Sequence, residues 1–290
     1  MVTNPVDPDD TFDLGDGLAV SRLGFGAMRL VGEDVIGPPR DERAARSVLR
    51  RAVDLGVDFV DTADSYGPGV SERLIGEELG PDDDVVVASK AGLLRNRDGD
   101  WIPHGDPDFL RNQVLCSLDR LSTDSIDLYQ FHRPDPDVDF ADSVHAFAEM
   151  KDAGRIDRVG LSNVSVEQLE TAQEIVEIAT VQNRYDVGNR DEEDVLRACE
   201  EYDVGFIPWG PMYAVEEEAA RGVLETVADE HGDGTTAHQV ALAWLLDHSD
   251  VMLPIPGTSS VDHLESNAAA VNLELTDDDV RKLNGIDPRP

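Results

Sequence analysis

Residues 57–67 read VDFVDTADSYG, an apolar run followed at once by small and polar residues. The stretches 85–92 (VVVASKAG) and 125–132 (SIDLYQFH) repeat this arrangement. Each apolar run has the length and the share of β-branched and aromatic residues that are typical of a buried strand. The sequence therefore predicts three strands that end on ionisable side chains, namely Asp61 with Tyr66 close behind it, Lys90 and His132.

Segments with helical spacing separate the predicted strands along the whole chain. Residues 107–121 give the clearest helix, with Asp106 as its N-cap and a proline in the first turn. Two further helices are predicted to have Ser71 and Ser165 as N-caps, because serine side chains accept hydrogen bonds from the first turn. This alternation of strands and helices predicts parallel βαβ units.

The number of predicted strands indicates the fold class. An eightfold repeat of strand and helix in 290 residues predicts an α/β protein, a (β/α)8 TIM barrel rather than an open sheet. We expect one domain over residues 1–290, with an N-terminal hairpin at 11–20 that closes the bottom of the barrel. The predicted strands lie at 23–28, 57–61, 85–90, 125–132, 157–163, 179–186, 204–210 and 251–257.

The carboxyl ends of these strands carry the candidate chemistry, because active sites of (β/α)8 barrels lie at that end. In such a site Lys90 lowers the pKa of Tyr66 from its usual value of about 10. Asp61 holds the lysine charged, and His132 orients a carbonyl group. Read singly, each of the four is more often structural than catalytic. Together they suit the reduction of an aldehyde or ketone by a hydride carrier.

The charge of the chain excludes some partners. It has 61 acidic and 24 basic residues, a formal net charge of −37. Nucleic acids and anionic membrane surfaces are therefore not expected partners, since both need clustered Lys and Arg. Only Lys90, Lys151 and Lys282 are lysines. This surface predicts adaptation to concentrated salt, where a Debye length of about 3 Å at 1 M screens self-repulsion; an ordinary acidic cytosolic protein is the alternative.

Targeting and metal-binding signals are not found. The first residues lack the apolar region of a signal peptide, and no apolar run reaches membrane-spanning length, so we expect a soluble, cytoplasmic protein. Cys116 and Cys199 make no disulfide framework. The remaining histidines, His238 among them, have no ligand spacing, so we expect them to be structural or at the surface and expect no metal.

The wording of several stretches resembles the aldo/keto reductase family over nearly the whole chain. DTADSYGPGVSERLIG at 61–76 matches the family's DTAxxYGxGxSExxxG pattern, and further matching stretches follow in the family's order. The stretches HRPDP, SNVSVEQLE and IPWGPM are most similar to a bacterial branch that includes pyridoxal reductase-like (pyridoxine 4-dehydrogenase-like) enzymes. The further matching stretches are ASKAG at 88–92, DLYQFHRPDP at 127–136, GLSNVSVEQLE at 160–170, VQNRYD at 181–186 and LPIPGT at 253–258.

The resemblance implies a role for each candidate residue. Tyr66 would be the general acid, supported by Lys90 and Asp61, and His132 would orient the carbonyl. Trp209 would stack on the nicotinamide ring of NADPH or NADH. The implied cofactor-binding residues are Ala27, Met28, Ser162, Asn163, Gln182, Trp209, Gly210, Met212, Gly257, Thr258, Ser259, His263 and Asn267.

The substrate side of the site is less defined by sequence. Arg29 and Arg133 follow strand ends and could meet a polar substrate or pair with surface acids. The loop at 95–106 contains Trp101 and is expected either to form one wall of the substrate pocket or to be a disordered tip. The implied substrate is a small carbonyl compound or alcohol.

The segment after the last predicted strand departs from the family. Most relatives place Lys or Arg there for the 2′-phosphate of NADPH, whereas residues 257–263 read GTSSVDH. His263 occupies the usual arginine position, and histidine is mostly neutral at pH 7. Residues 216–218 add three glutamates that would repel a phosphate. We therefore expect NADH to be used as well as NADPH, or better.

Two other functions remain open from the sequence. Some proteins of this fold are cofactor-binding regulatory subunits with little turnover, and these can keep the same four residues. A metal-dependent barrel hydrolase is the third possibility, but it would need clustered His and carboxylate ligands.

Overall fold

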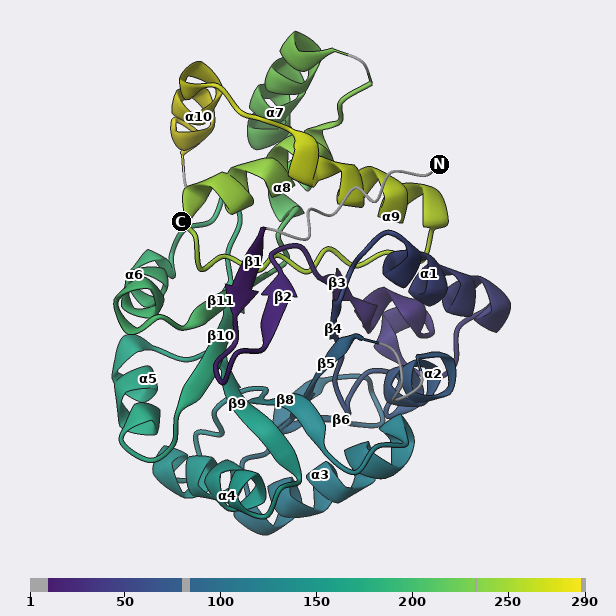
Figure 1. Cartoon of the computed structure of the whole chain (residues 1–290), viewed down its shortest axis with the longest axis vertical. Coiled ribbons are helices and arrows are strands. Elements are labelled where there is room, and N and C mark those ends of the chain that lie inside the picture. Colours follow the sequence, from purple (N-terminus) through teal and green to yellow (C-terminus); the bar gives the residue numbers. More distant parts are fainter. Residues whose placement is uncertain (1–9, 80–83, 233, 288–290) are drawn as a thin grey trace.

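The computed structural model describes residues 10–79, 84–232 and 234–287. Its centre is a parallel sheet that curls into a barrel, with helices around the outside (Figure 1). In the described residues seven strands form this sheet, in the order β11-β10-β9-β8-β5-β4-β3. They are β3 (Phe25–Gly26), β4 (Phe59–Asp61), β5 (Val86–Ala91), β8 (Ile126–Phe131), β9 (Ile156–Ser162), β10 (Ile178–Arg184) and β11 (Gly205–Trp209).

The eighth predicted strand, at 251–257, closes the barrel but does not form a regular ladder. On one side the Leu253 N–H donates to the Phe206 carbonyl of β11 at 2.8 Å. On the other side the Gly24 N–H, next to β3, donates to the Pro254 carbonyl at 3.0 Å. The two prolines of this segment have no N–H to give, so the ladder stays incomplete. The predicted barrel is confirmed, with a proline-rich segment in place of its last strand.

A hairpin covers the opposite end of the barrel from the candidate site, as predicted. It consists of β1 (Thr11–Asp13) and β2 (Ala19–Ser21), which pair antiparallel. The Ser21 N–H donates to the carboxylate of Asp58 at 2.8 Å, just before β4 begins. The guanidinium of Arg158, near the start of β9, donates to the turn between the two strands. Figure 1 shows the hairpin lying across this end of the barrel.

Helices surround the sheet and connect successive strands (Figure 1). The α-helices are α1 (Glu42–Asp54), α2 (Val70–Glu78), α3 (Pro107–Leu121), α4 (Phe140–Asp152), α5 (Val166–Gln173), α6 (Glu193–Tyr202), α7 (Glu218–His231), α8 (Ala237–His248), α9 (Val261–Ala268) and α10 (Asp277–Asn284). Short 3₁₀ turns are η1 (Ala27–Leu30), η2 (Glu33–Val35), η3 (Tyr213–Glu216) and η4 (Ala269–Asn272). No helix in the described ranges has both the length and the apolar composition to cross a membrane.

The predicted N-caps are right for two helices and wrong for one. Asp106 accepts from the first turn of α3, and Ser165 forms a capping box with Gln168 at the start of α5. The N-cap of α2 is Gly69, not Ser71. Ser71 lies inside that helix and is buried, and its hydroxyl accepts a hydrogen bond from a threonine hydroxyl at 2.8 Å. Ser71 therefore makes a tertiary contact inside the protein and does not cap the helix.

Three regular elements lie where the sequence predicted none. β6 (Leu93–Arg95) and β7 (Trp101–Pro103) form an antiparallel hairpin that overlaps the segment 95–106, which was expected to be a loop. The ordered hairpin contradicts the disordered alternative. Helix α10 was missed, although Thr276 and Asp279 give it a capping box that the sequence pattern displays.

Candidate active site

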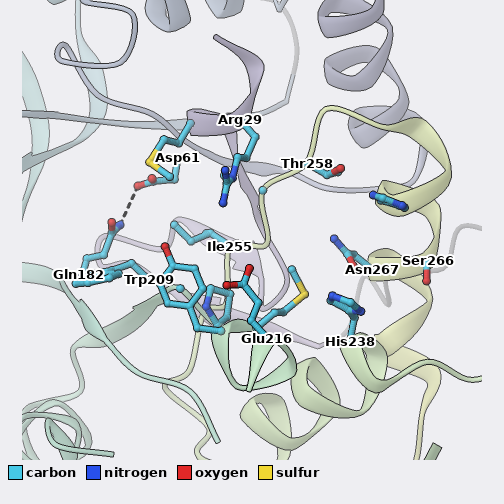
Figure 2. Close-up of a pocket in the computed structure, with 18 of the residues that line it drawn as sticks. Arg29, Asp61, Gln182, Trp209, Glu216, His238, Ile255, Thr258, Ser266 and Asn267 are labelled. Carbon is cyan, nitrogen blue, oxygen red and sulfur yellow. Dashed lines mark hydrogen bonds between the residues drawn. The ribbon is translucent and has the colours of Figure 1, made fainter. Parts of the chain in front are cut away.

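A buried carboxylate at the end of β4 joins three strands. Lys90 of β5 donates from Nζ to Asp61 Oδ1 at 2.6 Å. Gln130 of β8 and Gln182 of β10 donate to Asp61 Oδ2 at 3.1 Å and 2.9 Å. Figure 2 shows the bond from Gln182 to Asp61 at one end of the cavity described below. Because parallel strands end together, one carboxylate can accept from side chains that are far apart in sequence.

Lys90 is fully buried, and its ammonium group has two acceptors. Besides Asp61, it donates to the Thr62 carbonyl at 2.7 Å. Burial lowers the pKa of Lys90, while the Asp61 carboxylate acts in the opposite direction. The Lys90 ammonium lies 5.3 Å from the centre of the Tyr66 ring. A buried ion pair of this kind is costly to break, at about 3–5 kcal/mol when one partner is removed.

Tyr66 does not show the pKa that the sequence predicted. Burial raises its pKa well above 10, and the negative charges of Asp61 and Asp64 add to the rise. The expected lowering by Lys90 is therefore wrong for this structure. The reason is that the charge of Lys90 is already paired with Asp61, while burial and the carboxylates of Asp61 and Asp64 raise the pKa of the phenol. Tyr66 stays a protonated phenol at neutral pH, which is the form that can donate a proton.

His132 lies beside Tyr66 at the end of β8. The two rings meet edge to face, with centres 5.9 Å apart. Burial lowers the pKa of His132 well below 6.5, and the positive charges of Lys90 and Arg133 act in the same direction. The imidazole is therefore neutral at pH 7 and carries one N–H donor. Its Nδ1 lies 3.5 Å from the Ser65 hydroxyl.

The next three strand ends are linked by Asn163. Its side-chain amide donates to the His132 carbonyl at 3.0 Å and to the Ser162 hydroxyl at 2.9 Å. Its Oδ1 accepts from Trp209 Nε1 at 3.1 Å. The Ser162 hydroxyl donates to the Gln182 carbonyl at 2.7 Å. The structure thus brings these predicted cofactor residues into one network beside the Asp61–Lys90 pair.

An elongated cavity of about 440 Å³ opens beside this network. Figure 2 shows it running from Asp61 and Gln182 at one end to Ser266 and Asn267 at the other. We call these the inner end and the outer end. The predicted site residues that line it are Met28, Arg29, Asp61, Tyr66, Gln182, Trp209, Gly210, Met212, Gly257, Thr258, His263 and Asn267.

The other predicted site residues lie outside this lining. Ala27 is fully buried in the core, and Ser259 is exposed, whereas the neighbouring Thr258 is buried. The rest surround the inner end without lining the cavity; they are Lys90, Trp101, His132, Arg133, Ser162 and Asn163.

Sequence reasoning missed several lining residues. His238 was expected to be structural or at the surface, but it lines the outer end from the start of α8. The proximity of α8 to strand-end loops carries no local sequence signal. Gly26 packs closely, as a Cβ there would come within 2.7 Å of the Ile255 carbonyl. The missed residues are Gly26, Pro211, Tyr213, Thr236, His238, Ile255 and Ser266, whereas Glu216 also lines the cavity and had been expected near the cofactor phosphate.

The outer end of the cavity has little positive charge. Glu216, His238 and His263 line it, and Arg29 is the one arginine among the lining residues of the described chain. Burial lowers the pKa of His238, His263 acts in the same direction, and Glu216 opposes them. A second cavity, of about 560 Å³, shares Glu216, Thr236 and His238 with the first. Its arginine, Arg221, lies 3.9 Å from a carboxylate of the same helix.

Metal ligands do not gather anywhere in the described ranges. No group of three or more His, Cys, Asp or Glu side chains there could hold an ion. Cys116 and Cys199 are free thiols; Cys199 is buried and Cys116 half-buried. A metal-free site stays a prediction.

Comparisons with known proteins agree with this geometry. The family model described as "Aldo/keto reductase family" matches residues 22–288. Pyridoxine 4-dehydrogenase of Escherichia coli is 38% identical over 285 residues, which cover 96% of this chain and 98% of that protein. An uncharacterized oxidoreductase of Schizosaccharomyces pombe is 42% identical over 274 residues, with 94% and 89% covered. The similarity to the Escherichia coli enzyme bears out the branch expected from sequence.

A solved structure gives the same result. An aldo/keto reductase from Klebsiella pneumoniae, crystallised with NADP and acetate, superimposes with a TM-score of 0.82 at 26% identity. The match covers 97% of this chain and 96% of that one. With a family model matched over most of the chain and the barrel shared with a solved member, the chain belongs to the aldo/keto reductase family.

Proposed function

We propose that the protein is an NAD(P)-dependent oxidoreductase that reduces aldehydes or ketones and works reversibly on the alcohols. The observation that carries this proposal is the buried Asp61–Lys90 pair at 2.6 Å beside Tyr66 and His132, at the inner end of the elongated cavity. The aldo/keto reductase from Klebsiella pneumoniae that holds NADP supports the choice of cofactor.

Tyr66 and His132 have separate roles in the proposed reaction. A bound reduced nicotinamide would supply the hydride for the carbonyl carbon. Tyr66, kept protonated by burial, which raises its pKa, gives its phenolic proton to the carbonyl oxygen. The neutral imidazole of His132 donates a hydrogen bond to the same oxygen and orients it. In the reverse direction the phenolate form of Tyr66 would take the proton of the alcohol, and a bound oxidised nicotinamide would take the hydride.

The shape of the cavity fits a dinucleotide. It is long, and glycines line it where the chain segments meet: a Cβ at Gly257 would come within 2.7 Å of the Gly26 carbonyl. Gln182 and Trp209 stand at the inner end, where the nicotinamide would lie. Thr258 and Asn267 stand at the outer end, where the adenosine would lie.

We also propose that NADH is used as well as NADPH, or better. At the outer end Glu216 and two histidines stand where a 2′-phosphate would need a cation. Burial lowers the pKa of His238, so this ring adds no charge at pH 7. Arginine would bind a phosphate through charge-assisted bidentate hydrogen bonds, and neither imidazole can do so. Two acids of α7, Glu225 and Asp229, line the adjoining cavity and add to the repulsion.

The same proposal includes the setting of the protein. Residues 1–290 form one barrel domain and act in the cytoplasm on a small-molecule substrate. The net charge of −37 supports an enzyme that works in concentrated salt. Because a relative is named pyridoxine 4-dehydrogenase, pyridoxal is one of the aldehydes to test.

The deciding experiment follows oxidation of NADPH and NADH with a panel of aldehydes, at low and at molar KCl. Turnover with at least one aldehyde is expected. Tight binding of the cofactor with no turnover on any aldehyde would instead indicate the regulatory-subunit alternative. A preference for NADPH of about 100-fold, worth roughly 2.7 kcal/mol, would overturn the proposal on cofactor choice alone.

A further inference from the structure

Trp101 stands against the two side chains proposed to act on the carbonyl. Its ring centre lies 6.3 Å from that of Tyr66, at an interplanar angle of 88°. It lies 6.4 Å from the His132 ring, at 58°. Trp101 is not among the residues lining the elongated cavity, so it borders Tyr66 outside the space that the cofactor would fill. The indole therefore borders the place where the rest of a substrate must sit.

The Arg95 guanidinium packs against one face of the Trp101 indole. The two residues are cross-strand partners in the β6–β7 hairpin. The guanidinium carbon of Arg95 lies 3.7 Å from the centre of the Trp101 ring, which is a stacking distance. The same guanidinium donates to the carbonyl of Gly99, in the hairpin turn, at 2.8 Å. One side chain thus fixes both the turn and the ring.

Arg95 also reaches out of the hairpin to a second loop. It donates to the Asp34 carbonyl at 2.7 Å and to the Val35 carbonyl at 3.4 Å, both in η2. Both residues have positive φ, 55° and 60°. A β-branched residue such as valine rarely adopts that backbone conformation, so surrounding contacts must hold it.

The strained turn in η2 connects Arg95 to the loop of Tyr66. The Val35 carbonyl accepts a second hydrogen bond, at 3.1 Å, from the N–H of Gly67. Gly67 directly follows Tyr66, and the Val35 side chain packs against the small apolar cluster that contains Tyr66. Movement of this turn would therefore reach both Trp101 and Tyr66.

The hydrogen-bond acceptors of Arg95 are backbone carbonyls. In the described part of the chain no carboxylate lies within ion-pair distance of it, although the sequence has 61 acids. Asp34 and Asp100 still act electrostatically on its charge, but the contacts that hold Arg95 in place use the shape of its guanidinium. The planar fork of arginine can donate to several carbonyls while its face stacks on a ring, and lysine cannot do both.

We propose that Arg95 is a positioning residue that fixes Trp101 beside Tyr66 and His132, and so selects substrates whose group next to the carbonyl is flat and apolar. This inference rests on the proposed reductase function. An aromatic aldehyde packs its ring on the fixed indole. A short aliphatic aldehyde gains little from the same wall.

The test compares Arg95→Met with Arg97→Met. Arg97 lies in the turn of the same hairpin, its side chain is 96% exposed, and its replacement makes the same charge change. For each variant, kcat and KM are measured with benzaldehyde and with propanal, and the Kd of the cofactor is measured by fluorescence titration. We expect Arg95→Met to lower kcat/KM for benzaldehyde about tenfold, mainly through KM. Propanal reduction, cofactor Kd and the Arg97→Met enzyme should stay within about twofold of wild type.

A second variant, Arg95→Lys, separates charge from shape. It keeps the positive charge and loses the fork, so it should resemble Arg95→Met rather than wild type. Equal losses for both aldehydes together with a weaker cofactor Kd would show a general folding defect and overturn the proposal. Wild-type values in both variants would overturn it too.

A direct readout keeps this inference apart from the proposed function. If the wild-type protein reduces neither aldehyde, the reductase proposal fails, but the placement of Trp101 is still measurable. In a Trp209→Phe background, acrylamide quenching reports on Trp101, because Trp244 is fully buried. Quenching should increase in Arg95→Met and not in Arg97→Met; equal quenching in both would contradict a positioning role.

Discussion

The two ends of the cavity are built in different ways. At the inner end, side chains from β4, β5, β8 and β10 meet at Asp61, and its two oxygens accept three side-chain hydrogen bonds. At the outer end, Glu216, His238 and His263 come from η3, α8 and α9, outside the sheet. Glu216 is exposed there, whereas Lys90 at the inner end is fully buried.

This difference indicates that the inner end serves the proposed reaction, whereas residues at the outer end can vary and change the preference for a cofactor. A buried ion pair inside a closed network cannot lose one member without leaving an unpaired charge. A half-exposed histidine on a helix can be replaced with little effect on its neighbours. We therefore expect changes at the inner end to abolish turnover or folding, and changes at the outer end to alter only the choice of cofactor.

The largest effect is expected for Tyr66→Phe at the inner end. The ring and its packing stay, and only the proton donor is lost. Turnover should fall roughly 10²–10⁴-fold, the usual share of general acid catalysis. Cofactor Kd should stay unchanged, because the phenol acts on the carbonyl. An unaltered kcat, measured under saturating substrate, would remove Tyr66 from the mechanism.

Lys90→Met should damage both activity and stability. It leaves the Asp61 carboxylate buried without its cation, at a cost of about 3–5 kcal/mol in the free energy of unfolding. Lys151→Met is the matched control, since Lys151 pairs with Glu177 at 3.5 Å near the surface. That control should lose less than about 1 kcal/mol. Urea denaturation of both variants measures the free energy of unfolding. Equal losses of this free energy would mean that burial does not distinguish the two ion pairs.

His263→Arg tests the outer end. An arginine there should raise the ratio of kcat/KM for NADPH over NADH by about tenfold, through charge-assisted hydrogen bonds to the 2′-phosphate. His145→Arg, on the exposed face of α4, makes the same substitution far from the cavity and should leave the ratio unchanged. No change in either variant would indicate that the phosphate does not approach His263.

Added salt should raise the thermal stability of the protein through its whole acidic surface, rather than through either end of the cavity. With a net charge of −37, the folded chain repels itself, and KCl screens that repulsion. The Tm in molar KCl should exceed that in dilute buffer by at least about 2–4 °C, the shift that 1 kcal/mol makes in a domain of 150–250 residues. A Tm that is flat or falls with KCl would contradict adaptation to salt.

The smallest expected effect is on the pH profile. Burial lowers the pKa of His132 well below 6.5, so the ring is already neutral above that pH and its charge does not change as pH rises. Burial raises the pKa of Tyr66 well above 10, so the phenol keeps its proton up to that pH. The kcat for a neutral aldehyde should therefore vary less than about twofold between pH 7 and 9. Loss of activity through this window would mean that Lys90 lowers the pKa of Tyr66 after all, once cofactor and substrate are bound.

Much of the inner end could be predicted from sequence because it depends on strand ends. Asp61, Lys90 and His132 each follow an apolar run, and the barrel brings all such ends to one rim. The pKa of Tyr66 could not be predicted in the same way. Its direction depends on how much water reaches the phenol and on whether Lys90 is already paired, and both are properties of the packed site.

The outer end of the cavity and the β6–β7 hairpin are features that could not be predicted from the sequence. His238 lies 25 residues before His263 in sequence, and nothing local indicates that α8 and α9 bring both to one cavity. The stacking of Arg95 on Trp101 depends on a hairpin, whereas the sequence predicted a loop that was either a wall of the substrate pocket or a disordered tip.

The sequence by itself determined the alternation of strands and helices, the rim on which the polar residues gather, and the family. The alternation and the rim follow from local periodicity and from residue types at strand ends, which need no knowledge of distant contacts. The family follows from the resemblance of whole motifs such as residues 61–76. Only the tertiary structure decided that a proline-rich segment closes the barrel, that Tyr66 has a raised pKa, and that Arg95 holds Trp101 beside it. Those features depend on burial and on contacts between segments far apart in the chain, and such quantities exist only after the chain has packed.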